Sequence, residues 1–179
     1  MTAKTKPRAI ARVAPLSGPA AAAGARPAHW LMKSEPAEFS IDDLVAAPRR
    51  TTPWFGVRNY QARNYMRDAM RIGDLALFYH SSCDEPGVAG VVRVSKAAYA
   101  DRTQFDPSSA YFDPKASQAA PRWVLVDVKL VKKTPLLALA RMRREPQLAS
   151  MRVLQRGNRL SITPVTADEW RAVLALLDA

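Results

Sequence analysis

The strongest constraint on the fold is the order of the short apolar segments along the chain. Five segments have the length and pattern of β-strands, at residues 29–33, 75–80, 88–94, 123–131 and 159–163. Three helices are predicted, one after Ser40, one at 59–70 and one after Thr166. Because strands and helices do not alternate in βαβ order, we expect an α+β domain around a small, curved or barrel-like sheet.

Two of these helices begin with a capping box. Asp43 follows Ser40 by three residues, and Glu169 follows Thr166 by the same spacing. In such a pair each side chain accepts a hydrogen bond from the backbone N–H group of the other residue. The sequence therefore fixes where both helices begin.

Charge is the compositional feature that bears on function. The chain has 27 Lys and Arg against 16 Asp and Glu, a formal net charge of +11. Such a balance favours an acidic partner, most often nucleic acid, and a merely solvated basic surface is the alternative. Five of the cations lie in residues 1–28, an acid-free stretch rich in Ala and Pro that we predict to be a disordered tail before a domain at 29–179.

The composition also excludes several classes of protein. With Cys83, His29 and His80 as the only soft ligands, the chain has neither a disulfide nor a zinc set. The glycines fit no dinucleotide or P-loop pattern, and no apolar run reaches the ~18 to 20 residues of a membrane span. No secretory leader is indicated. We expect a cytoplasmic protein, by default a monomer, without metal or cofactor.

Two segments carry residue types that suit a ligand site. At the end of the first predicted strand, Lys33-Ser34-Glu35 offers hydrogen-bond donors and an acceptor. In the segment 54–60, a tryptophan lies near a glycine, which would let a flat ligand approach the indole face. Arg58 and Asn59 then lead into a helix whose free N–H groups attract anions. The alternative places the aromatic residues in the core and makes Asn59 a helix cap.

Arginines occur in two groups, one on the 59–70 helix and one at residues 141–159. Arg63, Arg67 and Arg71 recur every four residues and therefore share one helix face. Such a stripe is usually solvated, but beside an aromatic pocket it would contact phosphates.

A catalytic alternative comes from residues 77–85, which hold a histidine, hydroxyls, a thiol and carboxylates. A small-molecule hydrolase using His80 with Cys83 or Glu85 would need a nucleophile and a base that converge on one atom. Neighbours at a strand end seldom do so, which favours binding over catalysis.

Several long motifs in a fixed order then indicate a family. They are HWLMKSEP at 29–36, WFGVRNYQARN at 54–64, FYHS at 78–81 and RGNRLSITPV at 156–165. With them the chain resembles EVE domains over residues 29–175. The resemblance implies a PUA-like fold, a small mixed β-barrel flanked by short helices. It also implies a non-catalytic reader of a modified base, with modified cytosine in DNA as the ligand and modified RNA as an alternative.

The resemblance further implies a set of site residues. EVE domains are similar to YTH domains, in which an aromatic cage holds a methylated base. Trp54 matches the cage tryptophan, and Trp30 is the first choice for a second cage aromatic, ahead of Tyr111 or Phe112. The edge of the base would be read by Ser34, Asn59 and His80. The complete predicted set is Trp30, Lys33, Ser34, Trp54, Val57, Arg58, Asn59, Tyr79, His80, Ser81, Arg159, Leu160 and Ser161 for the ligand, with Arg63, Arg67 and Arg71 for phosphates.

Overall fold

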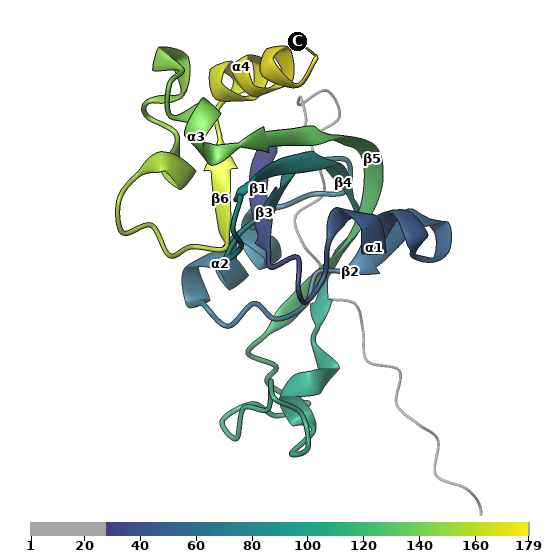
Figure 1. Cartoon of the computed structure of the whole chain (residues 1–179). Coiled ribbons are helices and arrows are strands. Elements are labelled where there is room, and N and C mark those ends of the chain that lie inside the picture. Colours follow the sequence, from purple (N-terminus) through teal and green to yellow (C-terminus); the bar gives the residue numbers. More distant parts are fainter. Residues whose placement is uncertain (1–27, 179) are drawn as a thin grey trace, which may run out of the picture.

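The computed structural model describes residues 28–178, which form one six-stranded mixed sheet with short helices around it (Figure 1). The strand order is β2-β5-β4-β3-β1-β6. The strands are β1 (His29–Ser34), β2 (Thr51–Pro53), β3 (Leu75–His80), β4 (Gly87–Ala100), β5 (Val124–Ala138) and β6 (Ile162–Val165). The helices are α1 (Ile41–Ala46), α2 (Tyr60–Asn64), α3 (Leu139–Met142) and α4 (Ala167–Leu177).

The predicted α+β class is confirmed, but the expected barrel is not closed. The edge strands β2 and β6 do not pair with each other within the described residues. β2 is only three residues long and ends at Pro53, which lacks the N–H group needed to extend a ladder. The sheet curves instead, and Figure 1 shows β5 bending around its edge.

The two long central strands extend beyond their predicted ends. β4 and β5 pair with four shifts in register, at which the residue-by-residue alternation of faces is interrupted. Because of this interruption, the alternating pattern stops before the strands end, and the strands predicted from that pattern are too short. The last strand also begins later than predicted, at Ile162, because residues 158–161 form a loop closed by the Asn158 side chain on the Leu160 N–H group.

Both capping boxes are present, at the starts of α1 and α4. The predicted 59–70 helix is shorter and irregular, because α2 passes at Tyr65 into a π-helical turn that ends at Ala69. Short 3-10 turns at Pro48–Arg50, Arg102–Phe105, Pro146–Leu148 and Arg152–Leu154 complete the helical structure. No helix among residues 28–178 has the length and apolar character needed to cross a bilayer.

The sheet separates two hydrophobic clusters, because successive side chains of a strand point to opposite faces. Trp30, Met32 and Phe78 belong to the cluster that also holds Trp54. Leu31 and Tyr79 belong to the other cluster, under α3 and α4. Each face of the sheet thus has its own buried cluster, and two neighbouring residues of a strand belong to different clusters.

Asp74 fixes the beginning of the fold. Its carboxylate is almost fully buried and accepts hydrogen bonds from the Ala28 N–H, the Arg71 N–H and the Trp30 indole N–H, each at 3.0 Å. Ala28, predicted as the last residue of the tail, is therefore part of the domain. The rest of the predicted tail lies outside the described residues.

Candidate functional site

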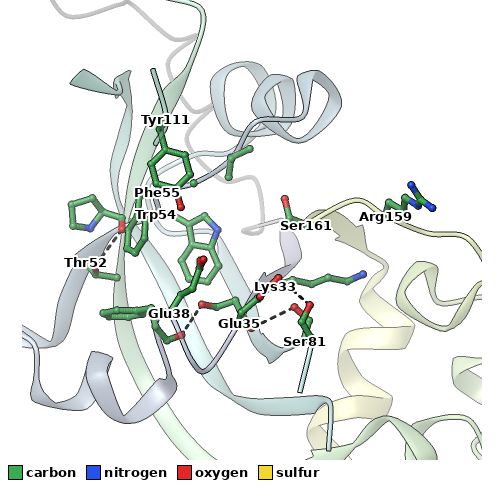
Figure 2. Close-up of a pocket in the computed structure, with 16 residues that line it drawn as sticks. Lys33, Glu35, Glu38, Thr52, Trp54, Phe55, Ser81, Tyr111, Arg159 and Ser161 are labelled. Carbon is green, nitrogen blue, oxygen red and sulfur yellow. Dashed lines mark hydrogen bonds between the residues drawn. The ribbon is translucent and has the colours of Figure 1, made fainter. Parts of the chain in front are cut away.

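The end of β1 opens into a pocket of about 400 Å³ (Figure 2). The sheet brings its polar groups together: Lys33 donates its backbone N–H to the Ser161 carbonyl at 2.7 Å, and Ser81 donates to the Ser34 carbonyl at 2.9 Å. Strands β1 and β3 and the residues before β6 thus meet at one end of the sheet. The lining residues are Lys33, Ser34, Glu35, Glu38, Phe39, Thr52, Pro53, Trp54, Phe55, Gly56, Val57, Ser81, Ser82, Tyr111, Arg159 and Ser161.

Trp54 is both a core residue and part of the pocket wall. Its backbone N–H donates to the Val126 carbonyl at 2.7 Å, and its indole packs edge-to-face on Phe78 with ring centroids 5.4 Å apart. Only 5% of the residue is exposed, so the indole is firmly held. In Figure 2 it lies at the centre of the pocket. The two sequence interpretations, core and ligand contact, therefore apply to the same side chain.

Of the three candidates for the second cage aromatic, Tyr111 is the one that lines the pocket. Trp30, the first choice, is buried in the core with its indole N–H bound to Asp74, so that prediction is wrong. Phe112 does not line the pocket either. The phenol of Tyr111 lies over Gly56, where an added Cβ would come 3.1 Å from the Tyr111 Oη. Gly56 has a φ of +78°, which an L side chain rarely adopts.

Arg58 supports Tyr111 instead of lining the pocket, contrary to its predicted role. Its guanidinium pairs with the buried Asp101 at 2.9 Å and donates to the Tyr111 carbonyl at 2.8 Å. It also lies 4.9 Å from the centre of the Tyr111 ring. Arg58 therefore links the loop between β4 and β5 to residues 54–57, which form one wall of the pocket.

Four further predicted ligand residues lie outside the pocket. Tyr79 faces the opposite cluster, where burial raises its pKa to about 12. Asn59 caps α2 by accepting from the Ala62 N–H. His80 Nε2 accepts from the Ile41 N–H at 3.1 Å, and burial lowers the pKa of His80, so the ring is held neutral. Leu160 lines a neighbouring groove. The resemblance implied all four as site residues, but a matching motif does not fix the direction of each side chain.

The remaining predicted residues do line the pocket: Lys33, Ser34, Val57, Ser81, Arg159 and Ser161. Ser34 Oγ donates to the Phe39 carbonyl at 2.6 Å, which holds the turn after β1. Burial lowers the pKa of Lys33, whose ammonium reaches the Asn158 carbonyl at 3.5 Å.

Two carboxylates in the pocket, Glu35 and Glu38, are absent from the complete predicted set of ligand residues. Glu35 accepts from Ser82 Oγ at 2.9 Å. The carboxylate of Glu38 has no hydrogen-bond partner among residues 28–178, and Figure 2 shows its side chain in front of the Trp54 indole. Glu35 is the acceptor that the sequence offered together with Lys33 and Ser34, and it does line the pocket. Glu38 lies in an irregular turn that carries no sequence pattern.

The predicted phosphate-contact arginines have partners within the protein. Arg63 donates to the Arg122 carbonyl at 2.7 Å, Arg67 pairs with Asp68 at 2.7 Å, and Arg71 donates to the Met70 and Asp68 carbonyls. None of the three lines the pocket. Their contact with phosphates stays a prediction.

The hydrolase alternative has no support in the geometry. Within the part of the chain that the structure describes, the imidazole of His80 has no hydrogen bond with Cys83 or Glu85, and its acceptor nitrogen is occupied. That same part holds no group of three or more His, Cys, Asp or Glu that could bind a metal ion. The polar pocket beside Trp54 is thus the strongest candidate site.

Comparison with known proteins identifies the family. Human thymocyte nuclear protein 1 is 45% identical over 166 residues, 83% of this chain and 73% of that protein. A solved structure of human THYN1 protein in complex with 5-methylcytosine-containing DNA has a TM-score of 0.79 and 43% identity, covering 85% of this chain and 98% of that one. The YTH domain of Zygosaccharomyces rouxii MRB1, solved with N6-methyladenosine RNA, shares the fold at a TM-score of 0.50 and 13% identity over 84% and 86% of the two chains. The EVE domain model matches residues 28–176, and the chain therefore belongs to the EVE domain family.

Proposed function

We propose that this protein binds nucleic acid without catalysis and reads a modified cytosine in DNA that is flipped out of the base stack. The observation that carries the proposal is the pocket of about 400 Å³ beside Trp54 and Tyr111. Its size lies within the range of small-ligand sites. An extruded base loses a few kcal/mol of stacking and pairing, and contacts with aromatic rings offset a cost of that size. The human relative solved with 5-methylcytosine DNA supports the same ligand.

The two carboxylates favour a base that carries an exocyclic amine. A carboxylate accepts a hydrogen bond from the N4 amine of cytosine, whereas thymine presents a carbonyl oxygen at that position. Glu38, whose carboxylate has no partner among residues 28–178, is available for this contact. The cations Lys33 and Arg159 line the pocket with it and suit the phosphate side of the same nucleotide.

A panel of three oligonucleotides tests the proposal. They are identical except for one residue, which is 5-methylcytosine, cytosine or thymine. Cytosine differs from 5-methylcytosine only in the methyl group, while thymine keeps the methyl group and lacks the amine. We expect the tightest binding to 5-methylcytosine, measured by fluorescence anisotropy. Equal affinity for all three would contradict base reading.

Two variants assign the roles. Trp54→Ala, checked first for folding, should cost about 1–3 kcal/mol for the modified oligonucleotide and much less for the others. Glu38→Gln should narrow the gap between 5-methylcytosine and thymine and leave the gap between 5-methylcytosine and cytosine unchanged. A matched RNA oligonucleotide distinguishes the RNA alternative, because only RNA carries the 2′-OH group.

A further inference from the structure

A second groove, of about 320 Å³, adjoins the pocket and is built mainly by the loop at residues 152–160. The two cavities share one residue, Arg159, which lines both. Figure 2 shows Arg159 on the far side of the pocket from Glu38. The groove is therefore a continuation of the pocket on its basic side.

The groove concentrates positive charge. Between Glu145 and Asp168 the chain has three arginines, Arg152, Arg156 and Arg159, and no acidic residue. All three line the groove and are exposed. Across residues 28–178, none of their guanidinium groups has a hydrogen bond or an ion pair. Arg63, Arg67 and Arg71, by contrast, all have partners within the protein.

The loop that carries these cations is held by its own polar side chains. Asn158 donates to the Arg152 carbonyl at 3.0 Å and accepts from the Leu160 N–H at 3.2 Å. Gln155 donates to the Ala149 carbonyl at 2.8 Å. The Lys33 ammonium, from the pocket wall, reaches the Asn158 carbonyl. The backbone of the loop is thus fixed, while its guanidinium groups are available for a ligand.

We infer that this groove binds the phosphate backbone next to the flipped nucleotide, so that the strand runs from the pocket along residues 152–160. The inference rests on the proposed function and adds the path of the strand. Guanidinium groups form paired hydrogen bonds with phosphate oxygens. The carboxylates repel phosphate from the opposite wall, so the base points toward Glu38 and the backbone lies on the arginines.

The test measures binding of the full chain to single-stranded DNA with one 5-methylcytosine, and to its unmodified counterpart, over a range of salt concentrations. Each phosphate contact in a single strand contributes about 0.7 to the slope of log K against log salt, or about fourfold in affinity near 0.15 M salt. We expect Arg152→Ala, Arg156→Ala and Arg159→Ala each to lose about that much on both DNAs. Arg171→Ala, an exposed control on α4 whose arginine pairs with Asp168, should leave the slope unchanged.

A methylphosphonate, which removes the charge of one phosphate, tests the pairing directly. Placed on either side of the 5-methylcytosine, one such substitution should weaken binding by the wild type and not weaken binding by Arg159→Ala any further. Wild-type slopes for the three arginine variants, or a loss of slope with the control Arg171→Ala instead, would overturn the inference.

The outcomes also separate the two proposals. A wild type that binds both DNAs equally refutes base reading, and the salt slopes still decide the groove. A wild type that binds neither DNA refutes both. Because the guanidinium groups of the three arginines have no hydrogen bond or ion pair in the described chain, their variants should keep the melting temperature of the wild type.

Discussion

Replacing Gly56 with alanine tests whether the pocket wall is preformed. The residue has a φ of +78°, and forcing an L side chain into that region costs on the order of 1–2 kcal/mol. The new Cβ would also lie 3.1 Å from the Tyr111 Oη. Arg58 stacks on the Tyr111 ring and binds its carbonyl, so the phenol cannot move away freely. Overpacking of this kind adds roughly 1–3 kcal/mol.

A matched control separates the two costs. Gly73 has a φ of +98° and no atom within 4 Å of an added Cβ, so Gly73→Ala should show the backbone strain alone. Tyr111→Phe removes the hydroxyl, after which the nearest Tyr111 atom to the Cβ is the ring carbon Cζ at 3.5 Å, an ordinary contact. In the Gly56→Ala background this second change should restore about 1 kcal/mol or more, since residues in contact couple by about 0.5–3 kcal/mol.

Urea denaturation of the wild type, the three single variants and the Gly56→Ala/Tyr111→Phe double variant measures these free energies. Binding of the oligonucleotide panel should weaken with Gly56→Ala and recover in the double variant. If Gly56→Ala costs no more than Gly73→Ala and shows no coupling to Tyr111, the phenol does not lie over Gly56 in solution. The idea of a preformed wall would then be wrong.

Three further predictions concern the support of the site. Gln104→Leu should cost at least about 3 kcal/mol in urea denaturation and expose the β4–β5 loop to proteolysis, because Gln104 is fully buried and binds backbone groups of Asp101, Arg122 and Trp123. Arg58→Met should cost about 3–5 kcal/mol by leaving the carboxylate of Asp101 buried without its cation, whereas loss of an exposed pair costs at most about 1 kcal/mol. Burial lowers the pKa of His80, so the unfolded chain binds a proton at higher pH than the folded domain, and stability should fall as the pH drops through about 6.5, the ordinary pKa of histidine. His80→Gln should lessen that fall in pH-dependent thermal melts, and an unchanged profile would refute the assignment.

Local signals predicted the parts of the fold that depend on neighbouring residues. The capping boxes at Ser40 and Thr166 fix the starts of α1 and α4 because both partners lie within one turn. The open sheet was not predictable in this way. Its edge depends on Pro53, whose effect appears only once β2 is known to pair with β5.

In the site, too, the features set by neighbouring residues could be predicted, and those set by distant parts of the chain could not. Trp54 could be recognised from its motif, because the glycine two residues later signals close approach of another group. What approaches Gly56 is Tyr111, from a loop more than 50 residues away, and sequence alone could not choose it over Trp30. Tyr79 illustrates the converse error, since it faces one cluster while its neighbour Phe78 faces the other. His80 packs on Phe78 and is engaged by the Ile41 N–H group instead of a ligand.

The pairing of β1 with both β3 and β6 has a consequence for synthesis of the chain. One edge of β1 can be covered by β3 early, but the other waits for β6, which begins more than 80 residues after β3 ends. At roughly 5–20 residues per second, translation leaves that edge open for about 4–16 s. An unpaired strand edge is a template for pairing with other chains. The nascent protein is therefore most exposed to aggregation just before its last strand emerges, and chaperones that cover β1 would act in that interval.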